Sequence, residues 1–219
     1  MAHIHLEDGS FTLQWIAVWY IIAGILLLLC LYWIRSKGKL DNRAIVMAAM
    51  VTAASFAIFQ VNIPIFGGVH MNLTPLIGIL VGPAIGGLIV LIVNILSAAI
   101  GHGGWGMIGA NVLVNMTEVL TAYLVFRWLG RVKLDMFSRA GLATLVGLLL
   151  GNCAMIIVIV ISGVQGTSQS QYDTLVGLSL LAAVNMGVAV IESIITGFAV
   201  AYISQVRPDM LGGVASARK

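Results

Sequence analysis

Residues 13–34 have the sequence LQWIAVWYIIAGILLLLCLYWI, which carries no charged side chain and leads directly into the basic segment RSKGK at residues 35–39. Aromatic side chains gather near both ends of the run, as they do in the interfacial belts of membrane proteins. About 20 residues at 1.5 Å per residue cross a hydrocarbon core of about 30 Å. The run therefore predicts a transmembrane helix.

Similar apolar runs follow along the chain, in which 60% of the 219 residues are hydrophobic and only 9% are charged. With a mean hydropathy of +1.07, the chain has no stretch polar enough to fold as a second soluble domain. The later runs are residues 44–60, two stretches within 73–100 that Gly82-Pro83 divides, 108–129, 141–162 and 174–203. The sequence predicts an all-α, multi-pass protein of the cell membrane with about seven transmembrane helices.

The stretch that ends near Val81 is too short to cross the membrane unaided, since it provides roughly 12–15 Å of helix. It follows the segment VNIPIFGGVHMN, residues 61–72, whose Pro and Gly content indicates an irregular loop. Either this loop dips into the membrane, or the two stretches around Gly82-Pro83 form a re-entrant hairpin. Irregular backbone at that depth must be buried in protein or line a cavity.

All eleven Lys and Arg side chains lie in three segments, residues 35–43, 127–139 and 207–219. Cytoplasmic loops of membrane proteins are enriched in Lys and Arg, so seven crossings put the N-terminus outside and the C-terminus in the cytoplasm. Because these side chains are explained as orientation signals, the net charge of +3 does not indicate a nucleic-acid partner. The histidines predicted to lie on the outer side are His3, His5, His70 and His102.

The N-terminal sequence MAHIHLEDG suggests metal chemistry. A free amine, a deprotonated backbone amide and a nearby imidazole form a nearly planar nitrogen set, which suits Ni(II) or Cu(II). If Met1 is retained, the amine, two amides and the ring of His3 provide four nitrogens. If Met1 is removed, the amine of Ala2 with the amide and ring of His3 provides three. His70 is then the leading candidate for the fourth position.

Four motifs resemble those of the CbiM/NikM family, the substrate-specific membrane subunits of energy-coupling-factor transporters for cobalt and nickel. They are HIHLEDG at 3–9, GGVHMNLTPLIGILVGP at 67–83, GHGGWGMIGANVLVNM at 101–116 and RPDMLGG at 207–213. The resemblance implies a seven-helix protein whose N-terminus plugs inward from the outside. The metal is then held by the N-terminal amine, a backbone amide, the N-terminal His and a His of the loop before the third helix.

By this resemblance, Met1, Ala2 and His3 are metal ligands together with His70. The family has Met followed directly by His, whereas Ala2 intervenes here. His5 is spaced better before the Asp-Gly pair of the motif, so His3 and His5 compete for the role. The chain is then a single polytopic domain with a metal-binding segment at 1–12, a transmembrane bundle at 13–203 and a cytoplasmic tail at 204–219.

Three further side chains are candidates for the surroundings of the metal. Asn111 and Asn115, with Glu118, recur on one helix face, and the resemblance places this helix beside the metal, where the two amides would orient a ligand His. Polar contacts between helices, without a ligand role, are the alternative. His102 is flanked by three glycines, and we expect it near the metal as a supporting side chain or a spare ligand.

The resemblance implies a substrate-binding subunit of an importer for Ni(II) or Co(II), with the metal as transported substrate. The chain lacks the Gly-x-x-x-x-Gly-Lys-Ser/Thr motif, so we do not expect an enzyme, and ATP hydrolysis falls to partners. The implied partners are a transmembrane coupling subunit, ABC ATPase subunits and a small accessory membrane subunit. The alternative is a self-sufficient secondary metal transporter coupled to protons through Glu118 or Glu192, which would favour internal repeats.

Overall fold

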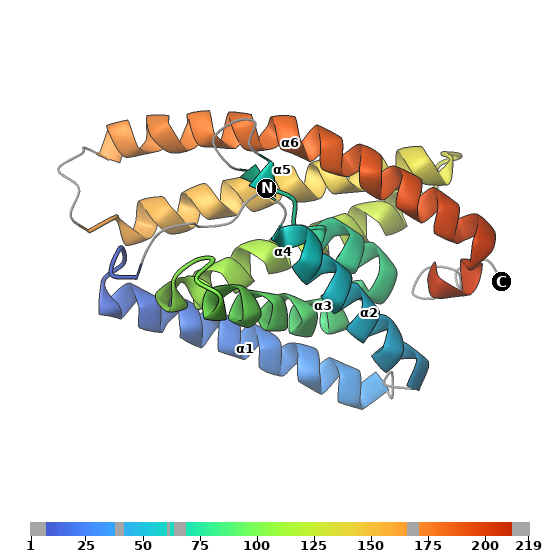
Figure 1. Cartoon of the computed structure of the whole chain (residues 1–219), viewed down its shortest axis with the longest axis horizontal. Coiled ribbons are helices and arrows are strands. Elements are labelled where there is room, and N and C mark those ends of the chain that lie inside the picture. Colours follow the sequence, from blue (N-terminus) through green and yellow to red (C-terminus); the bar gives the residue numbers. More distant parts are fainter. Residues whose placement is uncertain (1–7, 38–41, 61, 64–68, 166–170, 212–219) are drawn as a thin grey trace.

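The computed structural model describes residues 8–37, 42–60, 62–63, 69–165 and 171–211, and most of them are helical (Figure 1). The long helices are α1 (Leu13–Lys37), α2 (Asn42–Phe59), α3 (Thr74–Ala99), α4 (Ile108–Leu129), α5 (Met136–Ser162) and α6 (Gln171–Val206). The short elements are β1 (Asn62–Ile63), β2 (Val69–His70) and the 3-10 helices η2 (Trp105–Met107) and η3 (Pro208–Leu211). The all-α fold predicted from the sequence is confirmed, apart from the two-residue β1–β2 ladder.

Five of the helices, all except α2, are long and apolar enough to cross a membrane. Within the most apolar 18 residues of each helix, only 11% of α1 and 17% of α6 is buried in the protein. The corresponding share is 56% for α3 and for the span that contains α4. Exposed apolar surface of this extent is suited to lipid. The α3 and α4 helices therefore form the centre of the bundle.

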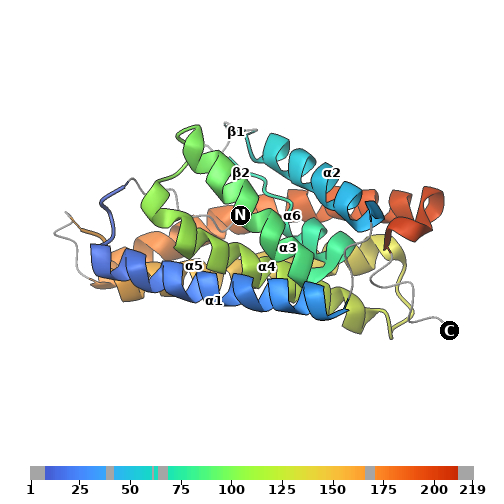
Figure 2. The same cartoon turned by 90° about the horizontal axis from the view of Figure 1, so that it is seen from below.

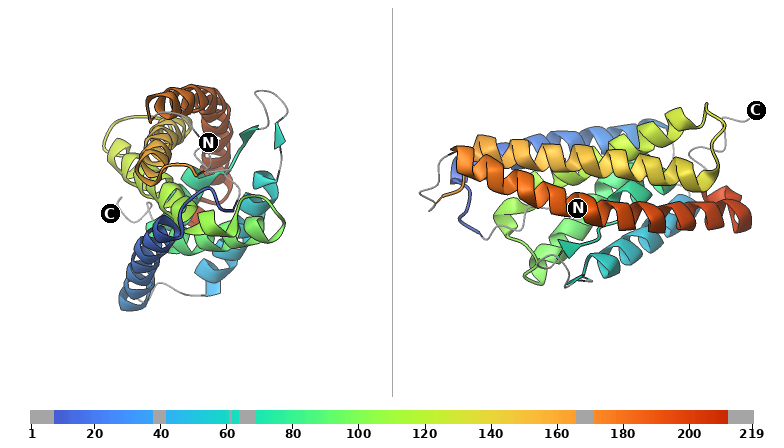
Figure 3. Two further views of the ribbon diagram at one scale, coloured as in Figure 1. Left: turned by 90° about the vertical axis from the view of Figure 1, so that its left-hand side faces the viewer. Right: turned by 90° about the horizontal axis from the view of Figure 1, so that it is seen from above.

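The outer helices run along this centre. The α5 and α6 helices lie side by side over most of their length (Figure 3), and α1 lies along α4 (Figure 2). In Figure 1, α1, α4 and α6 all finish at the right-hand end of the bundle. The predicted basic segments follow these three helix ends in the sequence.

The α3 helix is a hairpin of two legs, residues 74–81 and 83–99, joined at Gly82. Gly82 has φ 77° and ψ 172°, and Pro83 follows it; a glycine adopts this conformation at little cost. A Cβ atom on Gly86 would lie 3.2 Å from Cγ2 of Ile77, although nine residues of straight helix span about 13 Å. The second leg therefore folds back along the first, as the change of direction in Figure 2 also shows.

This hairpin bears on a point that the sequence left open. The two apolar stretches within 73–100 are the legs of one helical hairpin, so the described residues contain six long helices with seven helical segments. The division at Gly82-Pro83 is confirmed, and a helical hairpin was one of the two arrangements expected there. The preceding loop also turns inward, because Asn72 is only 3% exposed.

The first leg of α3 packs against α4 backbone to backbone. A Cβ atom on Gly78 would overlap the carbonyl oxygen of Val119. Gly86 of the second leg faces the same residue, where an added Cβ would lie 2.8 Å from Cγ1 of Val119. Small residues permit this close approach of helices in membranes.

The helix ends extend beyond the apolar runs where polar groups satisfy the backbone. The α5 helix begins at Met136 rather than at the predicted residue 141, because the Asp135 carboxylate accepts a hydrogen bond from the Ser138 amide at 3.0 Å. A capping carboxylate satisfies one of the free amides of a first helical turn. The apolar pattern alone therefore does not predict where α5 begins.

Candidate functional site

His70 lies at the end of β2, opposite Asn62 of β1, and is 6% exposed. The chain turns inward after it: Leu73, at the N-cap of α3, has the left-handed φ of 51°, and Pro75 occupies the first turn of the helix. Proline suits the first helical turn, where an amide would have no partner in the helix. His70 therefore lies four residues before the start of the first leg, on a segment with a defined turn.

His70 and His102 form a contacting pair although they lie on different loops. Their ring centroids are 4.3 Å apart and the ring planes stand at 86°. Phe59, at the end of α2, completes the cluster, with its ring centroid 5.0 Å from that of His102 and 6.0 Å from that of His70. Burial lowers the pKa of His102, which favours the neutral imidazole that can bind a metal.

The loop that carries His102 is also bonded to the N-terminal part of the chain. The Asp8 carboxylate accepts hydrogen bonds from the amides of Gly106 at 2.7 Å and Trp105 at 3.2 Å. Tyr20 of α1 donates to the Trp105 carbonyl at 2.6 Å. A Cβ atom on Gly104 would lie 2.5 Å from Oδ1 of Asp8, so this glycine allows the carboxylate to approach.

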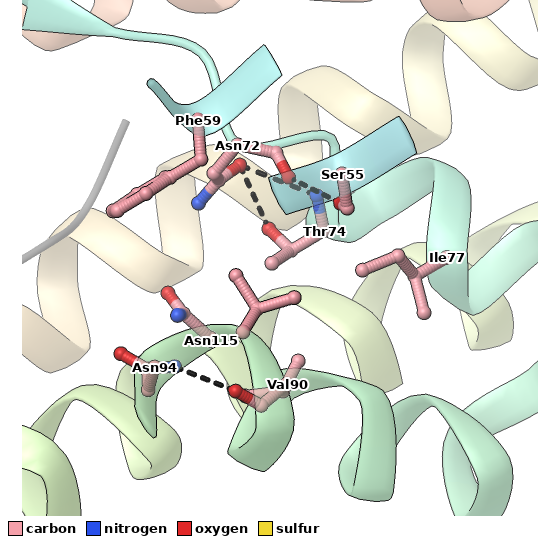
Figure 4. Close-up of a pocket in the computed structure, with 9 residues that line it drawn as sticks. Ser55, Phe59, Asn72, Thr74, Ile77, Val90, Asn94 and Asn115 are labelled. Carbon is pink, nitrogen blue, oxygen red and sulfur yellow. Dashed lines mark hydrogen bonds between the residues drawn. The ribbon is translucent and has the colours of Figure 1, made fainter. Parts of the chain in front are cut away.

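A small cavity of about 10 Å³ lies between the α3 hairpin, α2 and α4, and its lining includes Phe59 of the histidine cluster (Figure 4). Within it, Ser55 donates to the Asn72 carbonyl at 2.9 Å and Asn94 donates to the Val90 carbonyl at 2.8 Å. The Asn115 side chain points into this space, and its Oδ1 has no hydrogen-bond partner among the described residues. The lining residues are Ser55, Phe59, Asn72, Thr74, Ile77, Val90, Val93, Asn94 and Asn115.

Two fully buried acids lie next to this region. Glu118 accepts hydrogen bonds from Thr74 and, at 2.9 Å, from the Asn72 side chain. Glu192 of α6 lies near Glu118 and near the backbone amides of Asn72 and Leu73. A Cβ atom on Gly151 would overlap Cγ of Glu118, so α5 leaves room for this side chain.

The predicted site residues are therefore partly brought together. His70 and His102 touch, Asn115 lines the adjacent cavity, and Asn111 is buried one turn away on the same face of α4. The predicted ligands Met1, Ala2, His3 and His5 lie outside the described residues. Within the described residues, no group of three or more His, Cys, Asp or Glu side chains could hold a metal ion, so the histidine pair needs further donors.

Residues 5–210 match the sequence model of a known family, described as the CbiM cobalt uptake substrate-specific transmembrane region. The chain belongs to the CbiM family. It is 28% identical over 217 residues to the putative cobalt transport protein CbiM 1 of Methanocorpusculum labreanum, which covers 95% of this chain and 92% of that protein. It is also 28% identical to the putative fused nickel transport protein NikMN of Archaeoglobus fulgidus, over 95% of this chain and 68% of that protein.

The fold of this CbiM-family protein is shared with solved structures. A crystal structure of a transition metal transporter superposes with a TM-score of 0.79 at 18% identity, over 99% of this chain and 100% of that chain. A truncated transition metal transporter gives the same TM-score at 20% identity. The resemblance seen in the sequence is thus confirmed, and the chain is a multi-pass membrane protein of a cobalt and nickel uptake family.

Sequence reasoning about this CbiM-family chain missed several residues of the site. Asp8 was named from the sequence only as part of the HIHLEDG motif. Its hydrogen bonds to the amides of Trp105 and Gly106 join residues that are almost half the chain apart. Asn72 and Thr74, which bind Glu118, also had no assigned role. Their only sequence signal was that polar side chains cluster beside His70 in a segment that enters the bundle.

Proposed function

We propose that this protein is the substrate-binding subunit of an energy-coupling-factor importer and binds Ni(II) or Co(II) at its outer face. The observation that carries the proposal is His70, a buried imidazole on an inward-turned loop, in contact with a second imidazole and next to Phe59. Ionisable side chains inside membrane proteins are costly to bury and usually functional. The remaining nitrogens come from the N-terminal amine, a backbone amide and His3 or His5.

The proposed topology has seven passes within a single polytopic domain, with the N-terminus outside and the C-terminus in the cytoplasm. The passes are α1, α2, the first leg of α3 together with its inward-turned loop, the second leg, α4, α5 and α6. The common end at which α1, α4 and α6 finish supports this orientation (Figure 1), since the basic segments follow there. His102 and Asp8 belong to loops at the opposite, outer end.

The chain has no P-loop sequence, so the energy for uptake comes from partners in this proposal. These are a transmembrane coupling subunit, ABC ATPase subunits and a small accessory membrane subunit. The protein itself is no enzyme; it selects the ion and presents it. The side chains of Asn111, Asn115 and His102 support the ligands.

Replacing His70 with Ala is expected to weaken Ni(II) binding at least tenfold, or about 1.4 kcal/mol, because one nitrogen ligand is lost. Calorimetry on the purified protein measures this. The control is Cys153→Ala, which removes an exposed thiol, a group that could bind metal adventitiously. The Ni(II) affinity of this variant should equal that of the wild type. Equal affinity of His70→Ala and the wild type would contradict the proposed site.

The buried acids Glu118 and Glu192 support a second candidate, a secondary transporter coupled to protons. We expect the protein alone in liposomes to bind metal without accumulating it, and ATP-dependent uptake to appear only with its partners. Flux assays with an imposed proton gradient distinguish the two functions. Accumulation by the lone protein that is lost in Glu118→Gln or Glu192→Gln would establish the secondary transporter instead.

A further inference from the structure

We propose that the loop between α4 and α5 is a binding site for the headgroup of an anionic phospholipid. The site consists of Arg127 and Trp128 at the end of α4, with Arg131 and Lys133 in the loop. All four side chains are exposed. The loop follows α4 at the end of the bundle where α1 and α6 also finish (Figure 1). This site concerns the membrane around the protein and is independent of the metal site.

The basic side chains of the loop lack acidic partners. Asp135 is the only acid in residues 127–139, and its carboxylate caps α5 by accepting a hydrogen bond from the Ser138 amide at 3.0 Å. Arg131 and Lys133 form no ion pair with any residue that the structure describes. The charges of these two side chains are therefore available to an external anion.

Two other arginines near this end of the bundle have partners within the protein. Nε of Arg139 donates to the Phe126 carbonyl at 2.6 Å, and its guanidinium carbon lies 3.9 Å from the centroid of the Phe126 ring. Arg207 forms an ion pair with Asp209, with Nε 3.2 Å from Oδ1. An arginine near a helix end commonly binds the last carbonyls in this way. The cations of the α4–α5 loop are not used like this.

The local backbone gathers these cations on one side. The Arg131 amide donates to the Trp128 carbonyl at 3.0 Å, so the chain continues in a tight turn past the end of α4. Residues three or four positions apart in such turns share a side, which places Arg131 on the same side as Arg127 and Trp128. Nη1 of Arg127 donates to the Tyr123 hydroxyl at 2.9 Å. A guanidinium has five N–H donors, so others remain for a phosphate oxygen.

Exposed apolar side chains alternate with the cations of the loop. Trp128 is 61% exposed and Val132 is 50% exposed, and Leu134 is also exposed. This combination suits the membrane interface, where apolar groups contact acyl chains while Lys and Arg reach the phosphates. Tryptophan is enriched at that depth. An acidic protein segment would match the charges but would leave these apolar side chains without a partner.

The unpaired positive charge also selects among lipids. Phosphatidylcholine carries a choline cation that balances its phosphate, whereas phosphatidylglycerol has a net negative charge. Basic side chains near a membrane surface favour anionic lipids by about 1 kcal/mol each. We therefore expect the loop to bind phosphatidylglycerol more tightly than phosphatidylcholine.

The test titrates the purified full-length protein in detergent with each of these lipids and measures bound lipid by native mass spectrometry. Arg131→Gln should weaken phosphatidylglycerol binding about fivefold, the fold-change that corresponds to about 1 kcal/mol. The triple variant Arg127→Gln, Arg131→Gln, Lys133→Gln should weaken it about a hundredfold by the same relation. The matched control is Arg207→Gln, which removes the same charge from a side chain that pairs with Asp209. Its lipid affinity should equal that of the wild type.

Three results would overturn this assignment. The first is equal affinity of the wild type for the two lipids, and the second is an equal loss in Arg131→Gln and Arg207→Gln, which would reflect net charge alone. The third is displacement of phosphatidylglycerol by millimolar inorganic phosphate, which would assign the loop to free phosphate instead. Thermal unfolding in phosphatidylcholine checks that each variant is folded. Should the triple variant not fold, Arg131→Gln and Lys133→Gln carry the test singly.

Discussion

A protein whose N-terminal amine is acylated, or extended by an uncleaved tag, is expected to lose metal uptake entirely while it still folds and reaches the membrane. Acylation turns the amine into an amide, whose nitrogen lone pair is delocalised into the carbonyl and which binds a metal only after it loses its proton. An extension also removes His3 from its chelate position. The seven residues before Asp8 can reach at most about 25 Å. Because Asp8 is bonded to the loop of His102, that reach includes the histidine pair.

The comparison uses the same tag at the two ends of the chain. A tag after Lys219 leaves the amine free and should allow normal uptake in cells that also produce the partner subunits. Cleaving the N-terminal tag back to the native first residue should restore uptake. Normal uptake with an intact N-terminal tag would refute a ligand role for the amine.

Gly78→Ala is expected to cause the largest loss of stability, because the new methyl group would overlap the Val119 carbonyl oxygen. The obstacle is backbone of α4, which cannot move aside by changing a rotamer. Overpacking of this kind typically costs about 1–3 kcal/mol or more, and in a chain of this size 3 kcal/mol corresponds to a melting temperature lower by about 6 °C or more. Thermal unfolding in detergent measures the change.

Gly177→Ala is the matched control for this experiment. It makes the same substitution in α6, where nothing lies within 4 Å of the added atom. Its melting temperature should equal or slightly exceed that of the wild type, since alanine favours helix over glycine. Equal stability of Gly78→Ala and Gly177→Ala would show that the first leg of α3 does not press on α4 in this way.

Much of this fold could be predicted from local signals. Apolar runs of membrane length gave the helices, and Gly82-Pro83 marked the turn of the α3 hairpin. The start of α5 could not be found from hydropathy, because Asp135 caps residues that are not part of the apolar run. The length and composition of an apolar run are local properties, so they predict individual helices well.

The site was harder to predict because its contacts join distant segments. His70 and His102 were each expected on the outer side, but their contact depends on the hairpin between them. The bonds of Asn72 and Thr74 to Glu118 join a loop to the centre of α4. The sequence pattern of neither segment predicts these hydrogen bonds. The hydrogen bond between Asp8 and Trp105 could not be predicted for the same reason.

The first leg of α3 also connects two regions that lie far apart in the sequence. Its outer end follows Asn72, two residues after His70. Its inner end, at Ile79 and Leu80, packs in one cluster with Phe126 of α4 and Leu211 of η3. The eight residues of this leg span only about 12 Å, so the loop of His70 and the η3 cluster are separated by two turns of helix.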